Sequence, residues 1–191
     1  MDVGWVTEAS VEATATWKLP GRAWIVTGDL VGDNVVVAST VARDCYLIVL
    51  GAVRCRNLLV GSSASLVCVG PVSVAEVMIV TDADAVTLAA DKVTARVLVS
   101  GKGAWLTLSD EQQLAVEHLV GYVMIGAKPL RPSQRPDLDA LVVPEALDTR
   151  DWDSLDPADQ QEEARVDHVR IHAKAARARI EAGASILRSA P

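Results

Sequence analysis

A degenerate repeat with a step of roughly 20 residues runs through the first two thirds of this sequence and limits its possible folds more than any other feature. Its first anchor is a short apolar run that ends in glycine or alanine, at residues 26–28, 49–51, 68–70 and 88–90. Its second anchor is an apolar triplet, at residues 35–37, 58–60, 77–79 and 97–99. Both anchors recur with the same steps, which unrelated apolar runs are not expected to do.

A period of this length indicates a β-solenoid. Helical repeats are generally longer, and the Leu-x-x-Leu-x-Leu frame of leucine-rich repeats is missing. Roughly 20 residues allow three short strands and three turns, which make one coil of a β-helix. No coil can bury its apolar face alone, so stacked coils share a core, and we expect the glycines at tight corners. We therefore predict a mainly β fold, a parallel β-helix of about five coils over residues 1–126.

The composition agrees with a core of aliphatic strands. Half of the residues are apolar, yet the chain has no Phe and only two Tyr. Such a core must be built from Val, Leu, Ile and Ala, and β-branched residues favour strands.

The repeat alignment also predicts polar columns, because equivalent positions in parallel coils stack about 4.8 Å apart. In the column before the triplet, Asn34 falls beside Asn57, and Glu76 falls beside Arg96. One column earlier, Asp33 falls beside Arg56. Exposed cross-strand pairs contribute roughly 0.2–1 kcal/mol each and need no ligand to explain them.

A fifth copy begins at residues 105–108 and ends at residues 123–125. Between them, residues 109–112 read Ser-Asp-Glu-Gln, which has the form of a helix capping box. The sequence leaves open whether residues 109–118 form a short helix or part of the coil.

The composition changes after the repeats. Residues 127–155 include three prolines within 128–136, which predicts a linker or an extended wrap, with a docking patch at 141–144. Residues 156–191 are predicted to hold a C-terminal helix that starts at Asp156-Pro157 and stops at Gly183. Its apolar stripe consists of Val166, Val169, Ala173, Ala176 and Ile180.

The outer faces of the triplets suggest where that helix packs. If the two outer residues of each triplet face the core, the middle residues form an exposed apolar ridge of Val36, Leu59, Met78 and Leu98. We expect the C-terminal helix to lie on a solenoid face or to cap it. If it does not, the ridge is a site for a partner.

The net charge of −7 leaves no broad basic face, so nucleic-acid binding is disfavoured. We expect no secretion signal, because residues 1–5 offer neither a basic region nor a long apolar run, and no apolar run in the sequence reaches the roughly 20 residues that span a membrane. Three cysteines without a signal fit reduced thiols, and we expect a cytoplasmic protein.

Catalytic patterns are weak. His168 and His172 share a helix face at i and i+4, but no third metal ligand accompanies them. Asp82 and Asp84 lie in a predicted turn, and residues 101–103 read Gly-Lys-Gly without the rest of a phosphate loop. We expect no catalytic, metal or cofactor site.

Several segments together resemble a bacterial family of β-helical proteins associated with polymorphic toxin systems. Residues 26–30 read Val-Thr-Gly-Asp-Leu, and residues 56–60 and 94–99 read Arg-Asn-Leu-Leu-Val and Thr-Ala-Arg-Val-Leu-Val. Residues 143–147 read Val-Pro-Glu-Ala-Leu, and 180–188 read Ile-Glu-Ala-Gly-Ala-Ser-Ile-Leu-Arg. The resemblance covers residues 20–190. The Asn-His-Gly and paired histidines that family members often carry are replaced here by 81–85 and 100–103.

The resemblance implies an immunity-like protein, a monomer or small homo-oligomer, that neutralises a cognate toxin domain by direct binding. We expect contacts from the exposed columns, from one tryptophan and from the acidic stretch at 148–163. These candidates are Arg54, Arg56, Glu76, Arg96, Trp105, Asp148, Asp151 and Asp153. A self-assembling scaffold like the bactofilins and a carbohydrate-active β-helix enzyme are the alternatives.

Overall fold

The computed structural model describes residues 6–19, 23–38, 44–61, 63–81, 86–100, 104–108, 113–121, 123–125, 128–132, 136–157 and 170–188. The chain forms two units, residues 1–132 and 133–191, and each is described by itself. None of the described helices has the length and apolar character needed to cross a membrane.

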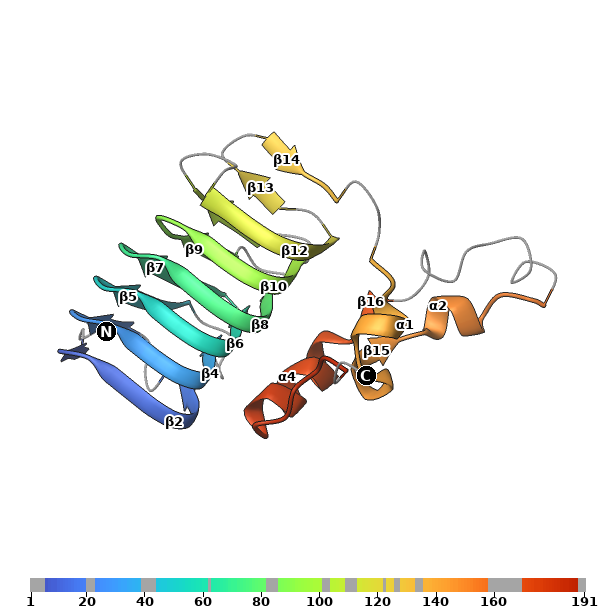
Figure 1. Cartoon of the computed structure of the whole chain (residues 1–191), viewed down its shortest axis with the longest axis horizontal. Coiled ribbons are helices and arrows are strands. Elements are labelled where there is room, and N and C mark those ends of the chain that lie inside the picture. The colour runs from blue at the N-terminus through green and yellow to red at the C-terminus, as the bar shows by residue number, and fades with distance from the viewer. Residues whose placement is uncertain are drawn as a thin grey trace. The chain divides into compact units, whose positions relative to one another are not determined.

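The first unit is a parallel β-solenoid, as predicted (Figure 1). In the described residues of this unit, the odd-numbered strands from β1 to β13, together with β14, form sheet A. These are β1 (Val6–Glu8), β3 (Ala23–Val26), β5 (Cys45–Val49), β7 (Ala64–Cys68), β9 (Val86–Ala89), β11 (Ala104–Thr107), β13 (Val123–Ile125) and β14 (Lys128–Leu130). The even-numbered strands from β2 to β12 form sheet B. These are β2 (Val11–Lys18), β4 (Leu30–Ala38), β6 (Val53–Gly61), β8 (Val72–Thr81), β10 (Val93–Ser100) and β12 (Leu114–Gly121).

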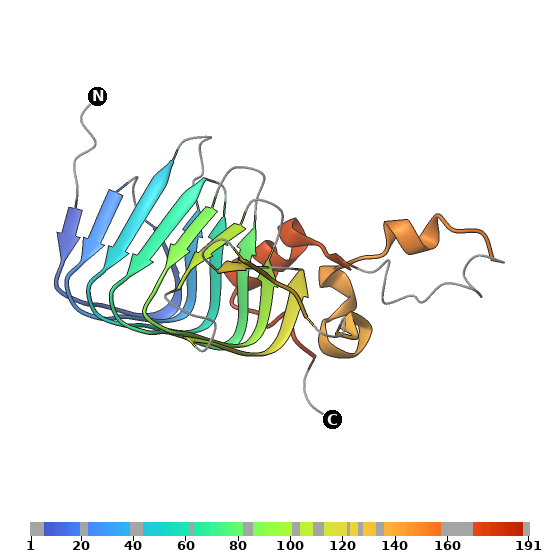
Figure 2. The same cartoon turned by 90° about the horizontal axis from the view of Figure 1, so that it is seen from above.

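The chain alternates between the two sheets, so each strand pairs with the strand one coil away. All these pairs are parallel except β13 with β14, which is antiparallel and places Pro129 opposite Met124. The strands of sheet B turn a corner part of the way along (Figure 2). The register shifts at this corner in several pairs, for example between Cys55 and Asn57. The expected number of about five coils is close to that observed.

The interior is filled by aliphatic side chains from both sheets, which explains why the chain needs no Phe. Alternate residues of each strand point inward. Sheet A contributes Leu47, Leu66 and Leu88, and sheet B contributes Leu30, Val53 and Val72, all with no solvent exposure. Successive coils therefore place aliphatic side chains at equivalent positions of the core.

Glycines mark tight corners, as predicted. A Cβ added to Gly70 would lie 2.7 Å from the carbonyl oxygen of Gly51, and one added to Gly51 would lie 2.6 Å from that of Gly28. Successive corners thus stack backbone on backbone, with no room for a side chain between them.

The four predicted triplets lie side by side in sheet B, but two of them are shifted by one residue. Residues 35–37 pair with 58–60, and these pair with 78–80 and 98–100, not with 77–79 and 97–99. In β8 the cause is an extra residue at the corner relative to β6, which moves the rest of the strand by one place. In β10 the extra residue precedes the strand, because Val93 pairs with Val72 at a step of 21 residues, whereas the predicted triplets follow each other at a step of 20.

This shift changes which residues form the expected ridge. Met78 and Leu98 belong to the interior cluster, in register with Leu58. Val36 and Leu59 are only 2% and 4% exposed. The outward column instead consists of Val36, Leu59, Ile79 and Val99, none of which belongs to the interior cluster. The prediction was therefore wrong in placing Met78 and Leu98 in the ridge, and wrong in expecting the column to be exposed, because its members are at most 8% exposed.

The last coil contains β11, β12 and β13. Trp105 and Leu106 pair with Met124 and Ile125, so the two ends of the predicted fifth copy are neighbours. Residues 114–118 belong to β12 and are part of the coil. The proposed capping box at 109–112 lies outside the described residues.

The second unit packs short elements around a small core. They are α1 (Leu138–Leu141), a 3-10 turn η2 (Pro144–Ala146), β15 (Leu147–Asp148), α2 (Arg150–Asp153), β16 (Arg170–Ile171) and α4 (Ala173–Glu181). Val142 forms an antiparallel bridge with Leu187. The buried residues are Leu138, Val142, Ala146, Ala176, Ile180, Ile186 and Leu187.

The C-terminal helix is shorter than predicted. It begins at Ala173 and not near Pro157, because Arg170 and Ile171 pair as a strand with β15, and His172 caps the helix. The Nδ1 atom of His172 accepts a 3.1 Å hydrogen bond from the amide of Ala175. The predicted stop is confirmed: Gly183 follows the helix with φ of 79°. Docking of this helix on the solenoid stays a prediction.

Candidate functional site

The outer face of sheet B before the corner carries four of the eight predicted contact residues. Alternation along β6 turns Val53 and Cys55 inward and turns Arg54 and Arg56 outward. Because all neighbouring pairs in sheet B are parallel, the outward positions of successive coils form columns. We call this surface, at residues 31–33, 54–56, 73–76, 94–96 and 115–117, the outer face.

Arg54 is held by a carboxylate from the preceding coil. Its Nη1 atom donates a 2.6 Å hydrogen bond to Oδ2 of Asp29. Oδ1 of Asp29 accepts a second bond of 2.8 Å from the backbone N–H of Ala52. The Ala52 bond and then the Arg54 bond lower the pKa of Asp29, so this carboxylate stays ionised. The side chain of Arg54 remains 55% exposed and so stays accessible to a partner.

Arg56 forms the predicted pair with Asp33, with 2.9 Å between Nη2 and Oδ2. The predicted asparagine ladder is also present at the corner, where Asn34 and Asn57 are fully buried. Nδ2 of Asn57 donates a 2.9 Å bond to Oδ1 of Asn34. The ladder continues on both sides, from Asn34 to Oγ1 of Thr16 and from the amide of Val77 to Asn57.

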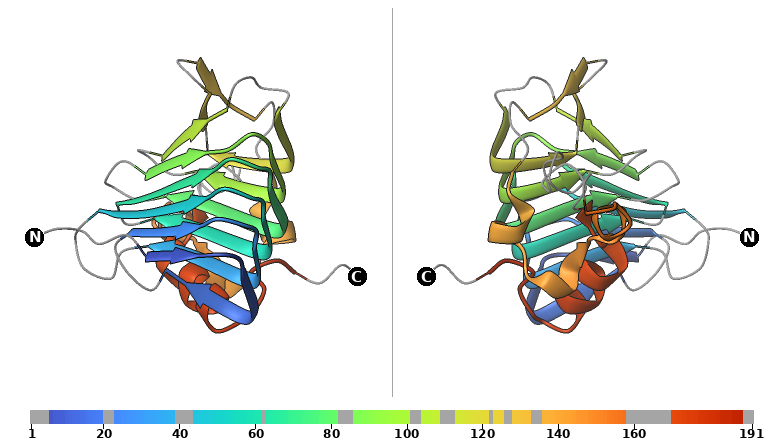
Figure 3. Two further views of the ribbon diagram at one scale, coloured as in Figure 1. Left: turned by 90° about the vertical axis from the view of Figure 1, so that its left-hand side faces the viewer. Right: turned by 90° about the vertical axis from the view of Figure 1, so that its right-hand side faces the viewer.

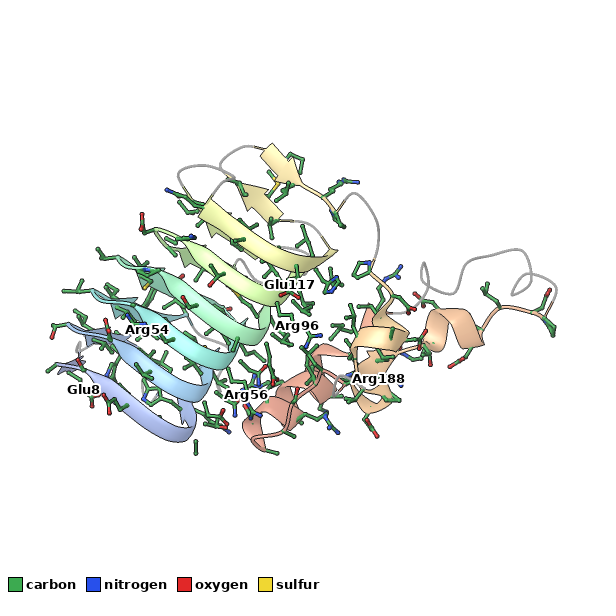
Figure 4. The ribbon with its side chains drawn as sticks, viewed as in Figure 1. Glu8, Arg54, Arg56, Arg96, Glu117 and Arg188 are labelled. Carbon is green, nitrogen blue, oxygen red and sulfur yellow. The ribbon has the colours of Figure 1, made fainter. Side chains whose placement is uncertain are left out.

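The column predicted beyond the asparagines differs from the structure. Val77, not Glu76, is in register with Asn57, because of the extra residue at the corner of β8. Nε of Arg96 lies 3.7 Å from Oε2 of Glu117 in the next coil, and both side chains extend from the same side of the sheet (Figure 4). The predicted pair of Glu76 with Arg96 stays a prediction.

An open groove of about 470 Å³ crosses the outer face over β8, β10 and β12. It exists because consecutive coils place small side chains there, with Ala75, Thr94 and Ala115 at outward positions. Arg96 and Glu117 supply its charge. Its lining residues are Val74, Ala75, Thr94, Ala95, Arg96, Ala115, Val116 and Glu117.

Sequence reasoning missed both the groove and Glu117. The usable signal was the small outward residues Thr94 and Ala115 in one column, which becomes visible only when the register is known.

The other four candidates do not join this face. Trp105 lies in β11, which belongs to sheet A. Asp148, Asp151 and Asp153 belong to the second unit, and Glu163, at the end of the predicted acidic stretch, lies outside the described residues.

Asp148 is occupied within its own unit. Its Oδ1 accepts a 2.8 Å bond from Nε of Arg150, and its Oδ2 lies 2.5 Å from Nη2. This hydrogen bonding with Arg150 lowers the pKa of Asp148 to about 2. Asp151 and Asp153 are exposed on α2.

In the part of the chain that the structure describes, no three potential metal ligands come together. His172 accepts a helix-capping bond, and His168, Asp82, Asp84 and residues 101–103 lie outside the described residues. Burial raises the pKa of the Cys55 thiol to about 12 and that of Cys68 to about 11. Thiols with such pKa values are poor nucleophiles at neutral pH.

No protein-family model, curated protein or solved structure matches the chain. The outer face must therefore be interpreted from its own chemistry, together with the motif resemblance in the sequence.

Proposed function

We propose that this protein is a non-catalytic protein-binding module, an immunity-like protein that neutralises a bacterial toxin by binding it through the outer face of sheet B. The observation that carries the proposal is the arrangement of one exposed and two partly exposed arginines, each beside a carboxylate of a neighbouring coil. Asp29 holds Arg54, Asp33 holds Arg56, and Glu117 lies beside Arg96.

Pre-positioned charges favour binding for two physical reasons. A side chain that is already ordered loses less conformational entropy when a partner arrives. A surface of alternating charge also selects a partner with the complementary pattern and repels others. Arginine is among the residues that most often dominate binding energy at interfaces, and the register of the parallel sheet keeps these arginines at fixed spacings.

The groove beside Arg96 offers an anchor point. A partner side chain inserted over Ala75 and Ala115 would be shielded from water, while Arg96 and Glu117 pair with polar groups around it. The toxin class of the partner is supported by the sequence resemblance alone. We place the encounter in the cytoplasm, where buried free thiols such as Cys45, Cys55 and Cys68 stay reduced.

The test uses the toxin domain encoded beside this gene. The full-length chain should rescue cells that express the toxin and should bind the purified domain in calorimetry. Arg54→Ala and Arg96→Ala should each weaken binding roughly tenfold to a hundredfold. Thr94→Trp fills the groove and should weaken binding as strongly.

The matched control is Ser65→Trp, which adds the same side chain to β7 of sheet A. It should bind and rescue like the wild type. The proposal fails if the wild-type chain neither binds nor rescues. It also fails if the outer-face variants match the control, because the contact would then lie elsewhere.

A further inference from the structure

The first coil ends in strand edges that no other described strand covers. β1 is the terminal strand of sheet A and β2 is the terminal strand of sheet B. Figure 3 (left) shows this blue end of the stack. Such an edge presents backbone N–H and C=O groups to any strand that can pair with it. At the opposite end of sheet A, β14 pairs with β13 in the antiparallel direction.

The sequence around β2 is complementary to itself when read in the reverse direction. Consider an antiparallel pairing of β2 with β2 of a second copy, centred on Ala15. Glu12 of one copy then lies opposite Lys18 of the other, and Val11 lies opposite Leu19. Ala13 lies opposite Trp17, a small residue beside a large one. The symmetry produces each of these pairs twice.

The side-chain directions agree with this register. Val11 belongs to the interior cluster and Trp17 and Leu19 pack against it, so these residues point inward. Glu12 and Lys18 are exposed, and they are in register with Val31 and Val36. Residues directly opposite in an antiparallel pair point to the same side of the sheet. In this pairing the inward-pointing side chains of one copy therefore lie beside those of the other. The acidic Glu12 of each copy lies beside the basic Lys18 of its partner.

The bend in β2 fits the same symmetry. The register between β2 and β4 shifts between Ala13 and Thr16, so the strand turns its corner around Ala15. A two-fold axis through that corner exchanges the two arms of the strand and reverses its direction. Residues 11–13 of one copy then meet residues 17–19 of the other.

We propose that two copies of this chain associate head to head by antiparallel pairing of their β2 edges about a two-fold axis at Ala15. The paired edges satisfy each other's backbone groups, and the two aliphatic interiors become continuous. Because each chain carries a net charge of −7, the two Glu12–Lys18 pairs also offset part of the repulsion between copies.

A charge exchange tests the register. The wild-type chain should sediment as a dimer across the micromolar range in analytical ultracentrifugation. Glu12→Lys and Lys18→Glu each place like charges opposite one another twice, and each should weaken dimerisation roughly tenfold. The double variant Glu12→Lys/Lys18→Glu restores opposite charges and should return to within about threefold of the wild type. Circular dichroism of all variants checks that each one folds.

A cross-link tests the axis. In this register Ala15 lies opposite Ala15, at a separation between strands that a disulfide can bridge. Ala15→Cys should form a covalent dimer under mild oxidation, whereas Lys92→Cys, an exposed position on a distant turn, should not. The described natural cysteines are buried and should not compete.

A wild-type chain that sediments as a monomer throughout this range overturns the proposal. So does a dimer that both single variants leave unchanged, because its interface would then lie on another surface. Failure of the double variant to recover, with the fold intact, rejects the register.

Discussion

The side-chain amide of Asn57 donates a 2.9 Å hydrogen bond to the side-chain carbonyl of Asn34, one coil earlier, and both residues are fully buried. The side-chain carbonyl of Asn57 in turn accepts a hydrogen bond from the backbone N–H of Val77, one coil later. A single side chain thus connects three coils at the corner of sheet B. A buried polar group contributes to stability only while its partners are present.

Asn57→Ala should therefore be costly. It leaves a buried carbonyl on Asn34 and a buried amide on Val77 without their partner, and we expect a loss of about 2–4 kcal/mol in the free energy of unfolding. Urea denaturation followed by circular dichroism measures this change. Ser73→Ala on the outer face is the control and should change the free energy by less than about 0.5 kcal/mol. Equal effects of the two substitutions would show that the ladder is not stabilising.

Stacked corners make Gly51 less tolerant of substitution than Gly183. A Cβ at Gly51 meets the carbonyl oxygen of Gly28 at 2.6 Å, so Gly51→Ala must move backbone in two coils. Gly183 has no atom within 4 Å of an added Cβ, and Gly183→Ala is strained only by its positive φ, at a cost of roughly 1–2 kcal/mol. Thermal denaturation should show a clearly larger loss for Gly51→Ala. A larger loss for Gly183→Ala would contradict the close approach of the corners.

The cysteines should react only when the solenoid opens. Burial raises the pKa of Cys55 to about 12 and that of Cys68 to about 11, so little thiolate forms in either at pH 8. We expect iodoacetamide to label these residues slowly under native conditions and rapidly in urea, as measured by mass spectrometry. Rapid labelling of the folded chain would show that the interior is accessible.

The pairing of β15 with β16 should weaken in acid. The pKa of Asp148 in the folded chain is about 2, below its ordinary value of 3.8, because the ionised form binds Arg150. A depressed pKa stabilises the folded state above the ordinary value, and the stabilisation is lost as the pH falls from about 4 towards 2. Hydrogen exchange of the peptides that contain β15 and β16 should accelerate over this interval.

Arg150→Met is the matched variant for that experiment. It removes the hydrogen bonds that lower the pKa of Asp148, so exchange in β15 and β16 should be faster at neutral pH and should change less between pH 4 and pH 2. An unchanged pH dependence in this variant would assign the acid sensitivity to another group.

The solenoid could be predicted because its signals are repeated in every coil. Glycine corners and apolar triplets recur at one step, and the Asp33–Arg56 pair and the asparagine ladder follow from the same alignment. The register of the third and fourth coils could not be predicted. One residue is added at the corner of β8 and one before β10, and each leaves the apolar pattern intact while it exchanges inner and outer positions of the triplet.

The second unit was predicted less well for a different reason. The start of α4 is set by β16, a strand of two residues whose partner lies more than twenty residues earlier in the chain. So short a strand has no periodicity of its own that the sequence could reveal. On the outer face, the arginines were identified by their charge. The groove depends on where large side chains are missing, which only the register reveals.

Pro129 sets a limit on how far this architecture can extend. It lies in β14, the last described strand of sheet A, and a proline has no N–H to offer a further strand. β14 also reverses the strand direction at that edge, so an added chain would meet an incomplete row of donors in the opposite orientation. Growth of sheet A is therefore self-limiting at this end, and the molecule is protected there against open-ended fibre formation.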